Sequence, residues 1–218
     1  MSNIGVISDG LDKIIPNPWC ELKFNTDYEL LISIVLSAQT TDKRVNQVTE
    51  VLFDKYPNLE RLKEASIEDL EMILKPLGSY RKKASYVSLI AKELVDRYDG
   101  KVPVKRSLLE SMPGVGRKTV SVFLSEFYNY PEFAVDTHVD RVSKRLGLAK
   151  DRDDVITIEK KLKKKFKKDE WGRRHKQFVL FGRYYCKAVS PMCDNCLLKS
   201  VCKKNKVSWP YFYCAFCG

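Results

Sequence analysis

Apolar side chains recur at helical intervals along nearly the whole chain, and this pattern limits the fold more than any other feature. Leu30, Leu31, Ile34, Val35 and Ala38 have the spacing of one buried helical face. The same spacing returns in later segments, whereas no run alternates apolar and polar residues well enough to predict a strand. We therefore predict an all-α fold, with helices of about 9–16 residues joined by short loops.

Residues that start or stop helices mark several boundaries. Ser66 stands three residues before Asp69 and predicts the start of a helix that ends near Pro76. Asp136 is a candidate N-cap for a helix that ends at Gly147. These signals place the predicted helices on definite segments of the chain.

The charge of the chain favours an anionic partner. Its 218 residues include 39 Lys and Arg against 28 Asp and Glu, a formal net charge of +11. Residues 1–100 carry −3 and residues 101–218 carry +14, so we expect the second half to bind the anion. Seven of the nine residues 160–168 are Lys, which predicts a solvated helix face or, as the alternative, contact with phosphates.

Targeting and membrane signals are missing from the sequence. The first ten residues lack the basic and apolar regions of a signal peptide, and no stretch approaches 18 consecutive apolar residues. We expect a cytoplasmic protein without a membrane anchor.

Six of the seven cysteines lie in the last 33 residues, and four have the spacing Cys186-x6-Cys193-x2-Cys196-x5-Cys202. Without a secretory leader, this density indicates a metal site rather than a disulfide framework. Four thiolates suffice for one metal centre, and the two-residue gap lets Cys193 and Cys196 reach the same centre. The single short pair and the wider flanking gaps favour an iron–sulfur cluster and leave zinc as the alternative.

A second candidate site is the segment Ser111 to Lys118, which reads Ser-Met-Pro-Gly-Val-Gly-Arg-Lys between two predicted helices. Gly114 and Gly116 have no Cβ, so a phosphate can approach the backbone closely. The helix that begins near Arg117 presents unpaired N–H groups and the positive end of its dipole. The segment predicts either a phosphate seat that reads no base sequence or a tight helix–helix turn, which needs the same glycines.

Lys118, Asp136 and His138 are the candidate reactive side chains. Beside Arg117 and a positive helix end, in a partly desolvated pocket, the neutral amine of Lys118 would be favoured and could act as a nucleophile. Taken alone, the local sequence allows a simpler interpretation of each residue: Lys118 as a surface lysine, Asp136 as an N-cap and His138 as a structural histidine.

Four motifs, in order, resemble the endonuclease III family of the helix-hairpin-helix DNA glycosylase superfamily. They are Leu36-Ser37-Ala38-Gln39-Thr40-Thr41-Asp42, Pro113-Gly114-Val115-Gly116-Arg117-Lys118-Thr119, Val135-Asp136-Thr137-His138 and the four-cysteine run. The resemblance covers residues 20–205 roughly.

The resemblance implies a two-domain fold. Residues 21–130 would form a six-helix barrel domain that contains the helix-hairpin-helix. Residues 1–20 and 131–218 would form the other domain, with a [4Fe–4S] cluster on the four cysteines between Cys186 and Cys202. The resemblance also implies that the hairpin binds a phosphate.

The resemblance further implies base-excision repair of double-stranded DNA that contains a damaged pyrimidine or an abasic site. A monomeric, nucleoid-associated enzyme would remove oxidised pyrimidines and cut the strand 3′ of the abasic sugar by β-elimination. Lys118 would attack C1′ and form a Schiff base, and Asp136 would stabilise the charge that develops and help to deprotonate Lys118. Gln39 matches the family residue that fills the hole left by the flipped base.

The same resemblance assigns further DNA contacts, and here the chain departs from the family in two places. Ser79 stands where the best-known relatives have an apolar wedge, and a serine cannot supply that unstacking contact. The loop after Cys186 has one basic residue, Lys187, where relatives often have several. The expected DNA contacts are Gln39, Ser79, Gly114, Val115, Gly116, Arg117, His138 and Lys187.

Two other classes of protein share some of these features. A non-enzymatic helix-hairpin-helix DNA-binding protein with a structural metal site would need neither Lys118 nor Asp136, so their presence argues against it. A zinc-dependent nucleic-acid protein would be colourless, unlike an iron–sulfur protein. The tail 208–218, with Cys214 and Cys217, extends beyond the usual end of the family and has no assigned function.

Overall fold

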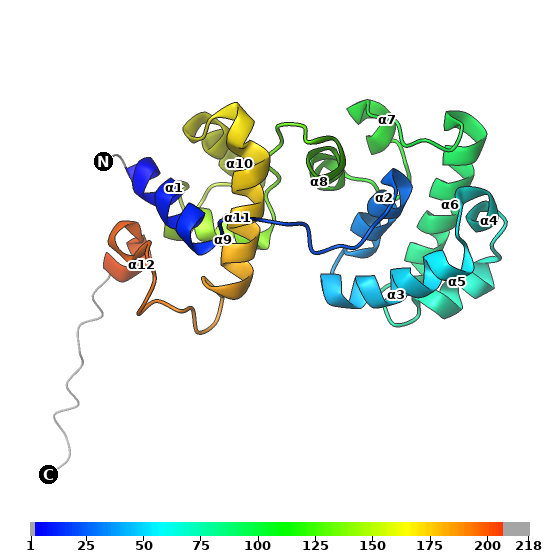
Figure 1. Ribbon diagram of the computed structural model, residues 1–218, viewed down its shortest axis with the longest axis horizontal. Coiled ribbons are helices and arrows are strands. Elements are labelled where there is room, and N and C mark those ends of the chain that lie inside the picture. Colours follow the sequence, from blue (N-terminus) through cyan, green and yellow to red (C-terminus); the bar gives the residue numbers. More distant parts are fainter. Residues whose placement is uncertain (1–2, 207–218) are drawn as a thin grey trace, which may run out of the picture. The chain divides into compact units, whose positions relative to one another are not determined.

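A computed structural model describes residues 3–206, and every regular element in that range is a helix (Figure 1). The α-helices are α1 (Asn3–Ile14), α2 (Asp27–Leu36), α3 (Asp42–Lys55), α4 (Leu59–Lys63), α5 (Ile67–Leu74), α6 (Tyr80–Tyr98), α7 (Arg106–Glu110), α8 (Arg117–Tyr128), α9 (Thr137–Arg145), α10 (Val155–Lys165), α11 (Trp171–Tyr184) and α12 (Lys203–Lys206). Two short 3₁₀ helices are η1 (Lys168–Glu170) and η2 (Lys199–Val201). The predicted all-α class is confirmed, although the helices span a wider range of lengths than predicted. The tail 208–218 lies outside the described residues.

The chain forms two compact units. One contains residues 19–134, and the other combines residues 1–18 with residues 135–218. Helices α2–α8 therefore belong to the first unit, which we call the barrel unit. Helices α1 and α9–α12 belong to the second, which we call the cysteine unit.

Helix α2 is the centre of the barrel unit. All its residues from Tyr28 to Leu36 are buried, as expected of a helix surrounded by others. It packs against α3, α6 and α8. Helix α8 contributes Phe123 to the same core, with its ring stacked on Phe127.

Local side-chain caps explain where several helices begin. The Ser66 hydroxyl accepts a hydrogen bond from Asp69 N (3.2 Å), and Asp136 Oδ1 accepts one from Val139 N (2.7 Å). Both predicted caps are confirmed. Helix α4 has no counterpart among the predicted helices.

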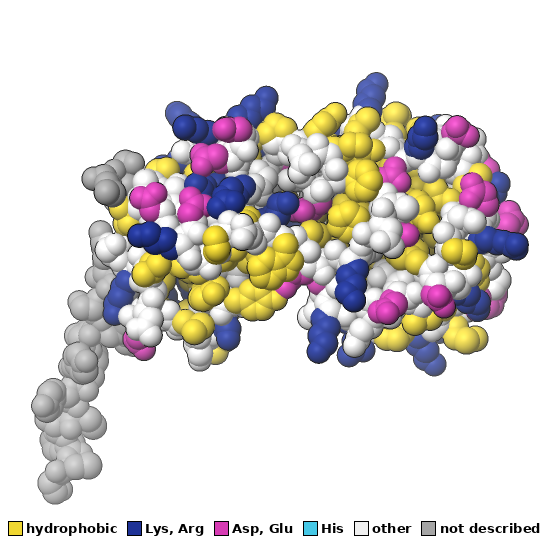
Figure 2. Space-filling view, viewed as in Figure 1, with side chains coloured by type: hydrophobic (Ala, Val, Ile, Leu, Met, Phe, Trp, Pro, Cys, Tyr) yellow, Lys and Arg dark blue, Asp and Glu magenta, His cyan; other side chains and the backbone are white. Residues whose placement is uncertain are grey.

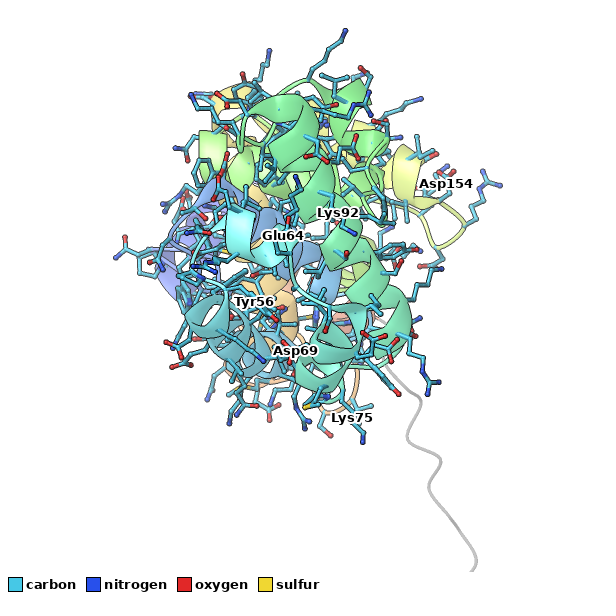
Figure 3. The ribbon with its side chains drawn as sticks, turned by 90° about the vertical axis from the view of Figure 1, so that its right-hand side faces the viewer. Tyr56, Glu64, Asp69, Lys75, Lys92 and Asp154 are labelled. Atoms are coloured by element: carbon cyan, nitrogen blue, oxygen red, sulfur yellow. The ribbon has the colours of Figure 1, made fainter. Side chains whose placement is uncertain are left out.

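A polar link joins α3 to α5 in the barrel unit (Figure 3). The Tyr56 hydroxyl donates to Asp69 Oδ2, and Lys55 Nζ lies 2.5 Å from Asp69 Oδ1. Burial and the hydrogen bond to this carboxylate raise the pKa of Tyr56 to about 12. The phenol therefore stays protonated and keeps donating at neutral pH.

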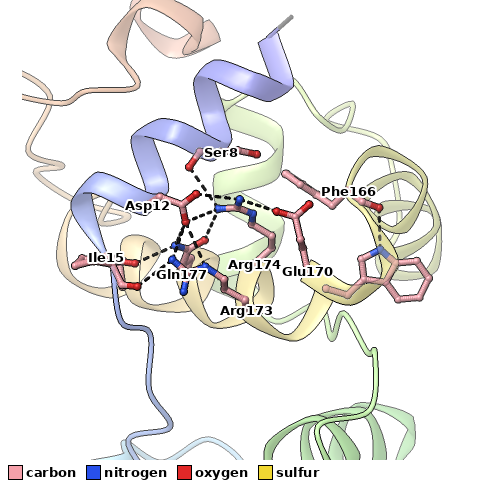
Figure 4. Close-up of polar contacts among 10 residues, drawn as sticks. Ser8, Asp12, Ile15, Phe166, Glu170, Arg173, Arg174 and Gln177 are labelled. Atoms are coloured by element: carbon pink, nitrogen blue, oxygen red, sulfur yellow. Dashed lines mark hydrogen bonds and ion pairs between the residues drawn. The ribbon is translucent and has the colours of Figure 1, made fainter.

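A buried arginine joins the two ends of the chain in the cysteine unit (Figure 4). Arg174 on α11 is 4 % exposed and donates to both carboxylate oxygens of Asp12 on α1, at 2.8 and 3.0 Å. It also donates to Glu170 (2.8 Å) and to the side chain of Gln177 (2.8 Å). Gln177 in turn donates to Ile15 O at the end of α1 (2.9 Å). These bonds hold α1 against α11.

Helix α1 also packs against the segment between Cys196 and Cys202. Leu198 is fully buried, and a Cβ at Gly10 would lie 2.3 Å from its Cδ2 atom. Only a glycine at position 10 lets α1 and Leu198 approach this closely. The docking of α1 on α11 therefore also determines where the cysteine segment lies.

Asp12→Asn should lower the midpoint of thermal unfolding at pH 7 by about 2–8 °C. The buried Arg174 would lose a charged partner, which corresponds to about 1–2 kcal/mol once partial exposure of Asp12 is discounted. Arg173→Met is the matched control: Arg173 also binds Asp12, but its side chain is 43 % exposed, so its loss should shift the midpoint by less than about 2 °C.

The ion pair between Asp12 and Arg174 also predicts that the stability of the fold depends on pH. Burial alone would raise the pKa of Asp12, but hydrogen bonds from Arg174, Gln177 and Arg173 together lower it well below its usual value. The carboxylate therefore stabilises the fold above its unfolded pKa of about 3.9, and this contribution is lost as the pH falls toward the folded value. The difference between wild type and Asp12→Asn should shrink below about pH 4, and a difference that stays constant would contradict this assignment.

Candidate functional site

The predicted hairpin lies between α7 and α8 in the barrel unit. Val115 N donates to Met112 O (3.1 Å), and both side chains are buried, which fixes the turn on the core. Gly114 has φ +77°, and a Cβ there would lie 2.4 Å from the Tyr86 ring. Its conformation and its contact with Tyr86 both require glycine.

Gly116 differs from Gly114, because nothing in the protein requires a glycine there. Its φ is −101°, which any residue can adopt, and a Cβ would meet no heavy atom within 4 Å. It is the N-cap of α8 and provides no side chain to cap the first N–H groups of that helix. The exposed backbone at Gly116 is thus open to an external hydrogen-bond acceptor.

Arg117 and Lys118 occupy the first turn of α8, and both are exposed. Within the described part of the chain, the side chain of Lys118 makes no hydrogen bond or ion pair. Its amine lies at the positive end of a twelve-residue helix. Asp136 belongs to the cysteine unit, where it caps α9 and is half-buried.

Gln39 and Ser79 are exposed residues of two turns in the barrel unit. Gln39 lies between α2 and α3 with φ +55°, and Ser79 precedes α6 with φ +54°. Both have the left-handed conformation, which is rare for residues other than glycine. Lys83, on the first turn of α6, donates from Nζ to Ala38 O and Thr40 Oγ1, both at 2.9 Å.

The four spaced cysteines line one cavity in the cysteine unit. All four are free thiols and half-buried. Burial raises the pKa of the Cys196 thiol, and the neighbouring thiols of Cys186, Cys202 and Cys193 raise it further, which reflects their proximity. Among the described residues, no three His, Cys, Asp or Glu side chains converge tightly enough to hold a single metal ion.

Two arginines of α9 hold the loop that begins at Cys186. Arg145 Nη1 donates to Lys187 O (2.7 Å) and to Cys186 Sγ (3.3 Å), and Arg141 Nε donates to Cys186 O (3.1 Å). Arg141 Nη2 also lies 3.1 Å from His138 Nδ1. The arginines thus link the predicted DNA contacts His138 and Lys187 to the cysteine cavity.

The lysine-rich segment 160–168 is partly paired within the protein. Lys161 Nζ lies 2.5 Å from Asp153, and Lys163 Nζ lies 2.8 Å from Glu159 and over the Trp171 ring. Figure 2 shows Lys and Arg side chains interspersed with Asp and Glu over both units on the face in view. This pairing favours the predicted solvated helix face over direct phosphate contact.

Sequence reasoning did not identify Lys83, Arg141 or Arg145 as parts of these sites. Their partners lie about 40 or more residues away in the sequence, at Ala38 and in the loop after Cys186. No local motif marks such pairs. A buried charge on an otherwise apolar helical face was the one available signal, and it applies only to Lys83.

The fold and the hairpin define a class of DNA repair protein. Residues 32–168 match the model of the HhH-GPD superfamily of base excision DNA repair proteins. Members of this superfamily carry the helix-hairpin-helix that α7, the glycine turn and α8 form here. No helix in residues 3–206 is long and apolar enough to cross a membrane.

Comparison with individual proteins narrows the class. The chain is 43 % identical to the endonuclease III of Bacillus subtilis (strain 168) over 209 residues, which cover 94 % of this chain and 95 % of the relative. Two solved structures, a trapped endonuclease III–DNA covalent intermediate and a non-covalent endonuclease III–DNA complex, each share 42 % identity, with TM-scores of 0.88 and 0.89. Both alignments cover 94 % of this chain, and they cover 98 % and 97 % of the respective structures. The chain therefore belongs to the endonuclease III family.

Membership confirms three of the expectations from the sequence: the family, the helix-hairpin-helix glycosylase fold, and the enzyme class of DNA glycosylase and abasic-site lyase in base excision repair. It also removes the non-enzymatic binding protein as an alternative.

The two hairpin glycines should respond oppositely to alanine. Gly114→Ala forces a left-handed backbone and a clash with Tyr86, and should lower the midpoint of thermal unfolding by several degrees, or about 1–3 kcal/mol. Gly116→Ala should leave the midpoint within about 1 °C, because its Cβ enters open space. Equal losses in both variants would show that the turn needs both glycines for folding.

Proposed function

We propose that this chain excises oxidised pyrimidines from double-stranded DNA and cleaves the resulting abasic site on its 3′ side, acting as a monomer at the nucleoid. The observation that supports the proposal is the position of Lys118. An exposed amine on the first turn of α8 follows the glycine hairpin, in a chain 42–43 % identical to endonucleases III. A protein that only binds DNA has no use for a nucleophile at this position.

The hairpin supplies a grip on DNA that is independent of base sequence. The uncapped N–H groups at the start of α8 and the open space at Gly116 suit a phosphate oxygen. Gly114 and Val115 hold the turn in shape, and Arg117 adds a positive charge beside it. His138 and Lys187 of the cysteine unit are further phosphate contacts in this proposal.

Lys118 performs the covalent chemistry. Its neutral amine attacks C1′ of the flipped nucleotide, and the bond from C1′ to the base breaks, so the base leaves with the electron pair and takes up the proton that the Lys118 nitrogen loses through Asp136. The sugar ring opens to a Schiff base, which makes the C2′ proton acidic. Loss of that proton expels the 3′ phosphate by β-elimination, and water then releases Lys118. Asp136 accepts the proton of Lys118 and stabilises the positive charge on the sugar.

Gln39 and Ser79 act on the base stack. Gln39 fills the position that the flipped base vacates, and Ser79 contacts the opposite strand at the same step. A serine supplies little apolar unstacking, so poorly paired lesions should be processed faster than well-paired ones.

The cysteine cavity fits a [4Fe–4S] cluster. Cys186, Cys193, Cys196 and Cys202 would hold it, as free thiols that line one cavity with a donated hydrogen bond from Arg145. When bound, the cluster supplies a covalent link across a 17-residue segment that has only one short 3₁₀ helix before Cys202. It thereby holds the Lys187 loop for phosphate contact.

Borohydride trapping tests the nucleophile. Wild-type protein should cross-link to a duplex with an oxidised pyrimidine, since borohydride reduces an iminium to a permanent bond, and the adduct should map to Lys118. Lys118→Gln should bind abasic DNA but neither cleave it nor cross-link. Arg117→Gln, which removes the adjacent charge, is the matched control and should still cross-link. An adduct formed by Lys118→Gln at the wild-type rate would place the nucleophile elsewhere.

Asp136→Asn removes the negative charge at position 136 but keeps the N-cap of α9, and the same assay measures its effect. Asparagine is an equally good N-cap, so the hydrogen bond from Val139 N and the stability of α9 should persist. The rate should nevertheless fall by about 10²–10⁴-fold, with the adduct still on Lys118.

Metal analysis of freshly purified protein tests the cluster. Wild type should be brown and contain about four iron atoms per chain. Cys196→Ser should lose colour and iron and lower the midpoint of thermal unfolding, because a bound cluster stabilises the folded state. Cys20→Ser is the control, since Cys20 belongs to the barrel unit and should not affect iron content. Stoichiometric zinc without iron would overturn the assignment.

A further inference from the structure

Lys83 is a buried lysine of the barrel unit that the proposed chemistry does not use. Its side chain is 4 % exposed, and its ammonium group donates to Ala38 O and Thr40 Oγ1, each at 2.9 Å. These two residues flank Gln39 in the chain. A single side chain of α6 therefore holds both sides of the turn that presents Gln39.

The environment of Lys83 is unfavourable for a charge. Its hydrogen-bond acceptors in the described chain are a carbonyl and a hydroxyl, without a carboxylate to compensate the ammonium. Burial accordingly lowers the pKa of Lys83. The neighbours along the same helical face, Ala84, Val87 and Ile90, are fully buried and apolar. An apolar residue at position 83 would avoid the desolvation of an unpaired ammonium, so stability of α6 alone does not account for the lysine.

What Lys83 holds is a strained turn. Gln39 has φ +55°, a left-handed conformation that is unfavourable for a residue other than glycine. The turn contains only residues 37–41 between α2 and α3, and Gln39 itself is exposed. Bonds from Lys83 on both sides can maintain this conformation before DNA arrives.

Lys83 also reaches the second turn. Its backbone N–H donates to Ser79 O (3.1 Å), which closes the first turn of α6 on Ser79. Ser79 has φ +54° and no side-chain cap bond. Lys83 is thus bonded to the Gln39 turn through its ammonium group and to Ser79 through the backbone of the first turn of α6.

We propose that Lys83 is a positioning residue that fixes the Gln39 turn to the Ser79 turn, so that both enter the base stack as one preformed unit. The inference rests on the proposed function, because it takes Gln39 and Ser79 as the residues that enter the duplex. A preformed pair loses little conformational freedom on binding, so more of the binding free energy is available to extrude the base.

Lys83→Met tests the proposal with two substrates. On a duplex with an oxidised pyrimidine, kcat/KM should fall by about tenfold or more, because Gln39 is no longer held. On a single-stranded oligonucleotide with an abasic site there is no stacked base to extrude, and cleavage should stay within about twofold of wild type. Lys92→Met removes an exposed lysine from the same helix (Figure 3) and should match wild type on both. Equal losses on both substrates would overturn the proposal.

A double-mutant cycle shows whether Lys83 acts through Gln39. In a Gln39→Ala background, Lys83→Met should cause little further loss on the duplex, since the group that it positions is already gone. Additive losses would show that Lys83 acts elsewhere. Fluorescence of 2-aminopurine opposite the lesion should report less unstacking by Lys83→Met than by wild type, a signal that general destabilisation of α6 does not predict.

A milder variant keeps the test valid where Lys83→Met folds poorly. Thr40→Val removes one acceptor of Lys83 at a half-buried position and should reduce kcat/KM on the duplex by about two- to fivefold, without loss on the single strand. Wild-type protein that cleaves neither substrate would refute the proposed function itself. Wild-type cleavage of the duplex together with unchanged Lys83→Met and Thr40→Val would refute only the role of Lys83.

Discussion

The ion pair between Arg174 and Asp12 connects the two ends of the chain, and the cysteine unit depends on that connection. The unit is assembled from residues 1–18 and 135–218, which are separated by the whole barrel unit in the sequence. Arg174 is nearly fully buried, so loss of Asp12 would leave a poorly compensated charge in the core. Because Arg174 holds α1 against α11, Leu198 can pack against Gly10. This contact fixes the position of the segment that carries the cysteines.

The cysteine cavity then depends on contacts from one more helix. Arg141 and Arg145 of α9 bind the carbonyls of Cys186 and Lys187, and Asp136 caps the start of the same helix. The proposed acid–base residue Asp136 and one proposed cluster ligand, Cys186, are therefore supported by a single helix of nine residues. A change in α9 should therefore affect both the proposed cluster site and the proposed chemistry.

The barrel unit supports the proposed DNA-contacting residues differently. Its core surrounds α2, and the residues proposed to contact DNA lie on turns at helix ends: Gln39, Ser79 and the Gly114–Gly116 turn. Each turn contains a residue with positive φ, which a rigid core can maintain more readily than an isolated loop can. Lys83 and Tyr86, both on α6, contact two of these turns, at Ala38 and Gly114. The helix thus serves as a common support for a proposed base-stack contact and a proposed phosphate contact.

Much of this organisation could be predicted from the sequence, because the interactions concerned are local. Helical periodicity gave the all-α class, the hydrogen bonds of Ser66 and Asp136 span three residues, and the cysteine spacing brings four thiols to one cavity. The domain bounds at residues 20 and 130 came from the family resemblance and stay a prediction, whereas the units of the structure meet along the chain at residues 18–19 and 134–135.

Interactions between distant segments were decided by the tertiary structure alone. Lys83 and Ala38 are 45 residues apart, Arg145 and Lys187 are 42 apart, and Arg174 and Asp12 are 162 apart. A sequence pattern records which face of a helix is apolar, but it does not record which polar group of another helix will meet a buried charge. That choice depends on how the helices pack, and packing is a property of the whole unit rather than of any segment.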